Sequence, residues 1–363
     1  MKVHRKAEGE RRKLFSFFQK KAGGESFPVQ AYILFACITA AILVFCVCAG
    51  SVNVPVRRTL QIIGQAIMRK PVTASASYRS IILSVRLPRV LCVALTGAAL
   101  SVCGAAMQGL LKNPLADGST LGVSSGASLG AVIAIAFGIT LPGVPFAGTM
   151  VMAMVAAFGS MLIILSLAYR LDRSLATNTI ILIGIIYSMF INSILSLIVT
   201  FAGEKVRSIT FWTMGSLAGS SYRNVLALLT ALLICGTVIL RYARELNAFA
   251  IGEDNARNIG VNVRKVRLVV LIAVSALVGV CVSVGGTIGF VGLVTPHITR
   301  MLTGPNHRRL LPAALFGGAS FLMLADLTAR VLLNPRELPI GVVTSFVGAL
   351  LFIYIFYRTR RGG

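Results

Sequence analysis

The side chains able to do proton or charge chemistry are few in this chain. Eleven Asp and Glu residues stand against 35 Lys and Arg residues. Asp326 lies within an apolar run, and Arg330 follows four residues later, on the same face of a helix. An acid inside such a run is costly unless it is paired. The spacing therefore predicts an ion pair that orients Arg330. A proton relay is the alternative, but no chain of further acids accompanies Asp326.

Side chains that bind metals or act as nucleophiles do not cluster. The three His residues stand at positions 4, 297 and 307, and the seven Cys residues fall in apolar runs without metal-ligand spacing to His. We interpret the cysteines as small hydrophobic residues, and we expect neither a catalytic centre nor a metal site. The ATP-binding pattern G-x-x-x-x-G-K-[ST] is also missing. If a nucleotide energises this protein, a partner subunit must bind ATP and Mg²⁺, and this chain needs no cofactor.

The elements that position these residues are membrane spans. Hydrophobic residues make up 56% of the chain and charged residues 13%, whereas a soluble domain averages about 25% charged residues. A spanning helix needs about 20 mostly apolar residues. The sequence therefore predicts an all-α polytopic membrane protein, with a permease domain over 28–363. The ten expected spans are 28–50, 90–111, 120–140, 146–168, 177–200, 224–241, 268–285, 289–303, 310–333 and 338–357.

The distribution of charge orients these spans. The net charge of +24 could indicate nucleic acid, but Lys and Arg lie between the spans, where the positive-inside rule places them. An inside N-terminus puts most of the basic residues and both termini in the cytoplasm. The basic segment 57–89 falls outside and needs its own explanation. Ten spans with both ends on one side form two sets of five, which favours an inverted repeat.

The N-terminal segment, 1–27, is a basic cytoplasmic leader. Two interpretations of it stay open. One is an amphipathic turn around Leu14–Phe18 that lies on anionic lipid. The other is a basic tail without fixed structure.

Three long motifs occur in series. They are RLPRVLCVALTGAALSVCGAAMQGLLKNPLADGSTLGVSSGASLGA (86–131), GTIGFVGLVTPHITRMLTGPNHRRLLPAALFGGASFLMLADLTAR (286–330) and ELPIGVVTSFVGALLFIYIF (337–356). Together they closely resemble the FecCD family, the permeases of ABC importers for ferric siderophores, haem and vitamin B12. The resemblance implies a ten-helix, type II importer permease in the bacterial cytoplasmic membrane. It also implies a second permease subunit, two ATP-binding subunits and an extracytoplasmic substrate-binding protein, with membrane lipid around the bundle and no nucleic acid.

The resemblance assigns a docking role to three basic residues. Arg86 and Arg89 lie at the outer mouth of the second span, and Arg330 lies at the outer end of the ninth. The matching arginines of the family pair with acids on the binding protein, and the planar guanidinium fork suits a carboxylate. Snorkelling to lipid headgroups is the alternative. The outer segment 204–223 resembles a short surface helix, with Phe211 and Trp212 as interfacial anchors.

Two further sets of residues concern the path and the turns. The polar positions expected along the translocation path are Asn192, Ser193, Ser196, Thr344 and Ser345. The helix-junction motifs contain Asn113, Pro114, Gly289, Gly292, Pro296, Asp326, Pro339 and Gly341. We expect Asp117 or Ser119 to cap the third span, and Glu337 to cap the last. The junction residues either form turns or act directly in transport, and both interpretations stay open. The runs of small residues either allow close helix packing or line the path, and the sequence does not separate these two roles.

The cytoplasmic segment between the sixth and seventh spans predicts a coupling helix over about 251–263. Ala256, Ile259 and Val263 recur on one helical face, Glu253 and Asp254 suit a helix N-terminus, and Gly260 suits its end. The run Asp254-Asn255-Ala256, with Gly260, partly matches the coupling motif E-A-A-x-x-x-G of ABC permeases, but Asp replaces Glu, Asn replaces Ala and the downstream I-x-L-P is absent. Glu253, Asp254, Ala256, Arg257 and Gly260 are therefore the expected ATPase-coupling residues. The implied role is a rigid knob seated in the ATPase, and an ordinary amphipathic connector is the alternative.

The function that the resemblance implies is import of an iron chelate, driven by ATP hydrolysis in a partner chain. Haem or vitamin B12 is the alternative cargo. An ion-coupled secondary transporter would need buried acids along the path, and only Asp326 qualifies. A membrane-embedded enzyme would need clustered His, Asp or Glu at one depth. The chain is therefore expected to be a permease subunit rather than an enzyme.

Overall fold

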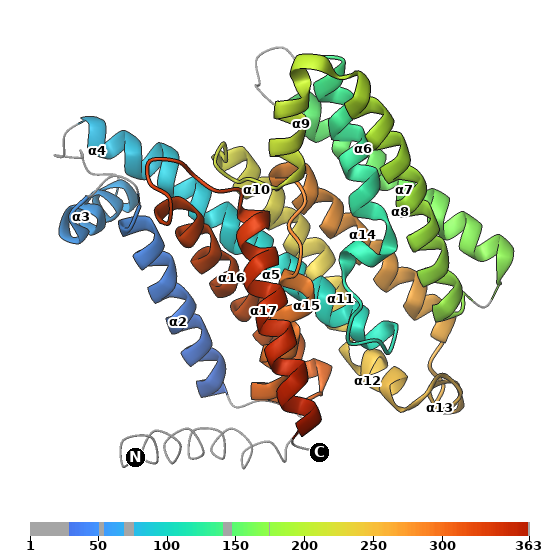
Figure 1. Cartoon of the computed structure of the whole chain (residues 1–363). Helices are drawn as coiled ribbons and strands as arrows, with labels where there is room; N and C mark the ends of the chain where they lie inside the picture. The colour runs from blue at the N-terminus through green and yellow to red at the C-terminus, as the bar shows by residue number, and fades with distance from the viewer. Residues whose placement is uncertain (1–28, 51–53, 69–75, 141–146, 174, 362–363) are drawn as a thin grey trace.

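The computed structural model describes residues 29–50, 54–68, 76–140, 147–173 and 175–361 (Figure 1). Helices and connecting turns account for this part of the chain, and no strand occurs in it. The predicted all-α fold is therefore confirmed. The basic leader, with its expected amphipathic turn, lies outside the described residues.

The helices follow one another in two halves. The first half contains α2 (Val29–Cys48), α3 (Val56–Ile67), α4 (Ala76–Ser80), the π-helical turn η1 (Ile81–Arg86), α5 (Leu87–Leu110), η2 (Gly118–Leu121), α6 (Val123–Ala136), α7 (Ala147–Leu171) and α8 (Thr177–Phe201). The second half contains η3 (Gly203–Lys205), α9 (Val206–Thr213), α10 (Tyr222–Ala231), the π-helical turn η4 (Leu232–Gly236), α11 (Thr237–Arg241), α12 (Ala243–Ile251), α13 (Glu253–Asn258), α14 (Val263–Gly285), α15 (Val291–Thr303), α16 (His307–Val331) and α17 (Ile340–Arg361).

Each predicted span corresponds to a helix, but the lengths needed correction. Within the described residues, seven helices are long and apolar enough to cross a membrane. The second span is one continuous helix, Ser77–Leu110, and it begins well before the expected start at residue 90. The third and eighth spans are shorter than expected, because α6 has 14 residues and α15 has 13. In both cases the residue directly before the helix has a left-handed conformation, with φ 77° at Gly122 and φ 66° at Phe290. The helix therefore cannot extend further toward the N-terminus, although the sequence there stays apolar.

The lengths of the helices support the inverted repeat. The third and eighth spans, which correspond in such a repeat, are the two short helices α6 and α15. Both have a left-handed N-cap without a side-chain hydrogen bond. The fourth and ninth spans, α7 and α16, have 25 residues each. The second and seventh, α5 and α14, are the two most buried long helices.

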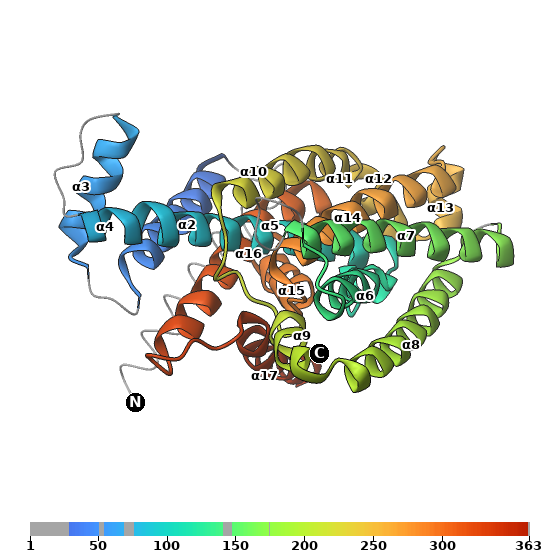
Figure 2. The ribbon, with the colours of Figure 1, turned by 90° about the horizontal axis from the view of Figure 1, so that it is seen from above.

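Helix α5 forms the centre of the bundle, and glycines bring its neighbours close. A Cβ on Gly97 would lie 2.3 Å from the carbonyl oxygen of Gly318 on α16, and a Cβ on Gly318 would lie 2.2 Å from that of Gly97. A Cβ on Gly104 would lie 1.8 Å from the carbonyl oxygen of Gly292 on α15. Small residues at crossing points are what close packing of membrane helices requires. The view from above shows α5 between α16, α15 and α10 (Figure 2).

The bundle has two distinct ends. Helices α12 and α13 lie at the same end as the C-terminal end of α17, and α3, α4 and α9 lie at the opposite end (Figure 1). We call these the α13 end and the α9 end. The basic segment 57–89 contains α3 and the first turns of the long second helix, with Arg58 placed 5.7 Å from the ring centre of Tyr78. At least one of the basic residues of this segment, Arg58, is therefore bound by a contact within the chain.

Candidate functional site

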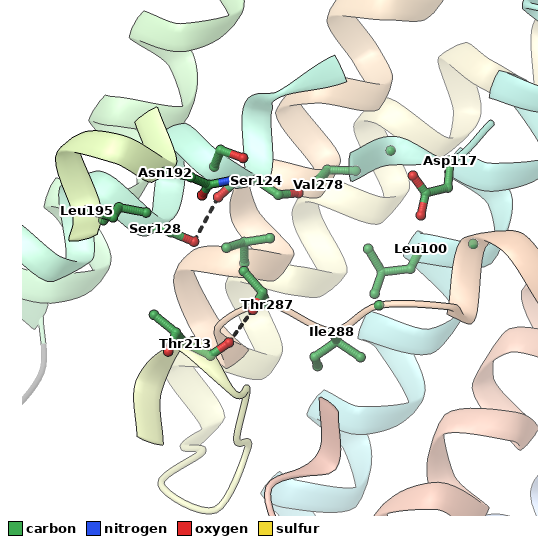
Figure 3. Close-up of a pocket in the computed structure, with 15 residues that line it drawn as sticks. Leu100, Asp117, Ser124, Ser128, Asn192, Leu195, Thr213, Val278, Thr287 and Ile288 are labelled. Atoms are coloured by element: carbon green, nitrogen blue, oxygen red, sulfur yellow. Dashed lines mark hydrogen bonds between the residues drawn. The ribbon is translucent and has the colours of Figure 1, made fainter. Parts of the chain in front are cut away.

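A cavity of about 320 Å³ opens between α5, α6, α8, α14 and the break that precedes α15 (Figure 3). Hydroxyl and amide side chains provide most of its polar lining, and Asp117 is its one carboxylate. Arg and Lys are not among the lining residues, which are Leu100, Asp117, Gly118, Ser124, Ser125, Ser128, Asn192, Leu195, Thr213, Val278, Val282, Thr287, Ile288, Gly289 and Gly292. Such a lining offers many weak contacts and no strong ionic site.

The polar groups around the cavity are partly used by the chain itself. The Ser128 hydroxyl donates to the carbonyl oxygen of Ser124 at 3.0 Å, within α6. The Thr287 hydroxyl donates to the carbonyl oxygen of Thr213, which ties the break before α15 to the end of α9 (Figure 3). Ser216 bonds through its amide to the carbonyl oxygen of Gly285. The extended segment that lines the cavity is therefore held in place by α9 and the turn after it.

The structure separates the five residues expected along the path. Asn192 on α8 lines the cavity. Ser193 and Ser196 are outside its lining, and their hydroxyls bond to carbonyl oxygens of their own helix at 3.0 and 2.9 Å. Thr344 is fully buried and bonds to the carbonyl oxygen of Gly341 at 3.1 Å, while Ser345 is half-buried beside Gly289.

Several lining residues were not singled out from the sequence. Asp117 or Ser119 was expected to cap the third span. Helix α6 has no side-chain cap at Gly122, and Asp117 lines the cavity. Ser124, Ser125 and Ser128 belong to the small-residue run 122–131, for which packing and path lining could not be separated. Alternation of hydroxyl residues with Gly in that run was the available signal.

Half of the helix-junction residues lie in turns or breaks between helices, namely Asn113, Pro114, Gly289 and Pro339. Asn113 accepts a hydrogen bond from the amide of Leu115 at 2.9 Å, in the turn after α5 that also contains Pro114. Pro339 directly precedes α17, and a Cβ on Gly341 would lie 2.3 Å from the carbonyl oxygen of Met214. The other four lie inside helices: Gly292 and Pro296 in α15, Asp326 in α16 and Gly341 in α17. The N-cap of α16 is Asn306, which accepts from the amide of Arg308 at 3.0 Å.

A buried charge network lies toward the α9 end. Arg89 donates to Asp326 through two nitrogens at 3.1 and 2.9 Å, and to Glu337 at 2.8 Å. Arg330 makes an ion-pair contact of 2.9 Å with the other oxygen of Asp326. The predicted i,i+4 pair is confirmed. Glu337 was expected to cap the last span, but it pairs with Arg89 instead.

The arginines expected to dock a binding protein are buried. The exposed fractions of Arg86, Arg89 and Arg330 are 5%, 7% and 4%. Arg86 donates to the carbonyl oxygens of Val47 and Cys48, and Arg330 donates to those of Cys46 and Ala49. These carbonyls at the C-terminal end of α2 have no partner within their helix, and cations stabilise such an end. The docking role stays a prediction, and the contacts add a second role, fastening α2 to the bundle.

The cytoplasmic segment between the sixth and seventh spans contains two short helices, and the second of them, α13, lies where the coupling helix was expected over about 251–263. Helix α12 ends at Ile251, Gly252 has φ 135°, and α13 begins with Glu253 and Asp254, as expected for a helix N-terminus. Helix α13 ends at Asn258, so the expected face over 251–263 is interrupted. Ala256 is buried, Ile259 is 69% exposed, and Val263 belongs to the next helix. Gly260 has φ 87°, which confirms it as a stop for the helix.

Two polar residues that anchor this segment were not predicted from the sequence. Arg267, on the second turn of α14, is 1% exposed and pairs with Glu253 on α13. It also donates to the carbonyl oxygen of Leu175, in the turn between α7 and α8. Asn247 on α12 accepts from the amide of His307 at 2.8 Å and donates to Asn306 at 2.8 Å. An Arg or Asn inside a basic connector carries no sequence signal that distinguishes it from its solvated neighbours.

Metal-binding side chains do not gather anywhere in the described part of the chain, since no group of three or more His, Cys, Asp or Glu could hold an ion there. The fold and the cavity together define a class, a polytopic α-helical membrane protein with a weakly polar cavity. The chain belongs to the FecCD transport family, whose model matches residues 38–358. It is a permease subunit of an ABC importer of that family.

Several permease proteins are similar in sequence to most of this chain. An ABC transporter permease of Bacillus subtilis (strain 168), YvrB, of uncharacterized role, is 41% identical over 334 residues, which is 92% of this chain and 95% of that protein. The cobalamin import permease BtuC of Halobacterium salinarum is 38% identical over 75% of this chain and 72% of its own length. The molybdate import permease MolB of Haemophilus influenzae is 36% identical over 78% of this chain and 83% of its own length.

A solved structure has the same fold. It is described as an inward-facing conformation of a metal-chelate type ABC transporter, and it superposes with a TM-score of 0.76 at 30% sequence identity. The match covers 90% of this chain and 98% of that one. The fold of this chain is therefore one already seen in a solved ABC transporter.

Proposed function

We propose that this chain forms half of the membrane channel of an importer that moves a ferric siderophore into the cytoplasm. A second permease subunit, the same chain or a related one, would complete the path. Two ATP-binding subunits would dock at the α13 end, which would then face the cytoplasm together with both termini. A substrate-binding protein would deliver the cargo at the α9 end.

The observation that carries this proposal is the chemistry of the cavity. Among the described residues, its lining is hydroxyl, amide and apolar, with Asp117 as the only carboxylate and no Arg or Lys. A large chelate that another protein delivers must be released from the path again. Weak contacts with many hydroxyl groups allow that release. A small oxyanion such as molybdate would instead favour Arg or backbone amides aimed at it.

Cobalamin or haem is the second candidate cargo, and a cobalamin permease is among the relatives. Both are bulky, so the lining does not separate them from a siderophore. Ion-coupled transport is a more distant alternative. Its support weakens because Asp326 is 1% exposed and held between two arginines, where it would not exchange ions with the path.

The test of the proposal is purification of the tagged chain from its own host in mild detergent. We expect an ATPase and an extracytoplasmic binding protein to co-purify, and we expect that binding protein to bind a ferric siderophore more tightly than cobalamin or haem. Tighter binding of cobalamin would move the cargo to the second candidate. Cargo uptake that persists in a strain without the ATPase gene would contradict the proposal as a whole.

A further inference from the structure

Arg267 joins three elements that the chain order keeps apart. It lies on α14, pairs with Glu253 at the start of α13, and donates to the carbonyl oxygen of Leu175 in the turn between α7 and α8. A longer contact of 3.5 Å reaches the hydroxyl of Thr177, the first residue of α8. With an exposed fraction of 1%, the guanidinium is enclosed by these partners.

The turn that Arg267 contacts is joined to α8 by further hydrogen bonds. Leu175 is buried and has φ 54°, a conformation that few non-glycine residues adopt without support. Asp172 caps α8 by accepting from the amide of Ala176 at 2.9 Å, and it lies 3.4 Å from the hydroxyl of Thr179. A displacement of this turn therefore moves the first turn of α8 with it.

Helix α8 leads from this turn to the cavity. It has 25 residues, and only Ile180, Ile183, Gly184 and Ile191 are buried. Asn192, which lines the cavity, lies 15 positions after Thr177, or about 22 Å along the axis at 1.5 Å per residue. In the view from above, α8 lies at the edge of the bundle and curves away from α7 (Figure 2). Of the buried residues of α8, Ile180, Ile183 and Gly184 lie in the half of the helix nearer to Arg267.

We propose that Arg267 is the positioning residue that transmits the movement of α13 to the path-lining helix α8. This inference rests on the proposed function, because the movement of α13 is attributed to the ATPase. Arg suits the role because its planar fork binds a carboxylate and a carbonyl oxygen at the same time, which Lys does less well. Because Arg267 is buried, it acts through Glu253 and Leu175 rather than by touching the ATPase.

The test uses the complete importer, with its ATPase and binding protein, reconstituted in proteoliposomes. The variants are Arg267→Lys, which keeps the charge, and Glu253→Ala, which removes the partner at a site where the side chain is 29% exposed. Lys265→Gln, on an exposed residue of α14, is the matched control. We expect both variants to assemble and hydrolyse ATP while cargo uptake per ATP falls at least about threefold, and the control to match the wild type.

Hydrogen exchange of the same purified complexes gives a readout that does not depend on cargo. Loss of the Arg267 contacts should speed amide exchange in 175–180 as well as in α13, whereas Lys265→Gln should leave both unchanged. Unaltered uptake per ATP in both variants, or unaltered exchange in 175–180, would overturn the inference. Absence of ATP-dependent uptake in the wild type would refute the proposed function instead, and the exchange result would still decide whether Arg267 links α13 to α8.

Discussion

Arg89 on α5 and Asp326 on α16 form a buried, two-pronged ion pair, with nitrogen–oxygen distances of 3.1 and 2.9 Å. Arg330 and Glu337 complete the network, so that two positive and two negative groups share one region. Removing one partner of a buried pair leaves an uncompensated charge, which costs more than the pair contributes. This relationship makes Asp326 a structural residue.

Exchange of Asp326 for Asn should therefore destabilise the fold by about 3–5 kcal/mol, because two arginines lose their shared carboxylate. The measurement is thermal unfolding of the purified chain in detergent. Arg336→Gln, beside the network but exposed, should change stability by less than about 0.5 kcal/mol. Equal unfolding temperatures for Asp326→Asn and the wild type would contradict the network's role.

Charge reversal at the outer arginines tests docking of the binding protein. Arg86 is the better site, because it donates to neutral carbonyl oxygens of α2. A Glu at position 89 would instead face the carboxylates of Asp326 and Glu337 and be repelled by them. We expect Arg86→Glu to weaken association with the binding protein, measured by surface plasmon resonance on complexes of confirmed unfolding temperature. Association and uptake that stay unchanged in the Arg86→Glu, Arg89→Glu double variant would rule docking out.

Closeness of α5 and α15 makes Gly104 intolerant of a methyl group. Its Cβ would fall 1.8 Å from a backbone oxygen, which cannot rotate away, so Gly104→Ala should destabilise by about 1–3 kcal/mol. Gly159→Ala, on α7 with open space around it, should be neutral or slightly stabilising, because Ala favours helix over Gly. The measurement is the thermal unfolding temperature of the two variants. Equal temperatures for Gly104→Ala and Gly159→Ala would show that α5 and α15 leave room for a methyl group at Gly104.

The cavity predicts different results for neighbouring positions on α8. Phe in place of Asn192 would project into the cavity and should reduce cargo uptake several-fold while ATP hydrolysis continues. Phe in place of Ser196, which lies outside the lining, should reduce uptake less. Radiolabelled cargo uptake in proteoliposomes measures both. A larger loss at Ser196 than at Asn192 would indicate that the path runs along another face of α8.

The sequence was informative about spans because hydrophobicity over about 20 residues is a long, averaged signal. Asp326 and Arg330 could be paired for a similar reason, since one helix fixes their spacing. The helices α6 and α15 begin three and two residues after the expected positions 120 and 289, because Gly122 and Phe290 adopt left-handed conformations directly before them. Ile259 was placed on a helical face that does not form, because α13 ends at Asn258.

Sequence patterns did not predict the contacts between segments that lie far apart along the chain. Arg89 and Asp326 are 237 positions apart, and Arg267 and Leu175 are 92 apart. Nothing local marks these residues, since Lys265 and Arg267 look alike in a basic connector, although one is exposed and the other enclosed. Serine hydroxyls posed the same problem: Ser128 lines the cavity and Ser193 does not, and only the packing of α6 and α8 decides which.

The most direct test of the account is uptake into proteoliposomes that contain this chain, its partner permease and its ATPase subunits, with the binding protein and ferric siderophore outside. ATP enclosed in the vesicles should drive uptake. Omission of the binding protein, or replacement of the phosphate-binding Lys of the ATPase, should abolish it. Uptake at the same rate without ATP, driven by an imposed ion gradient, would contradict the account.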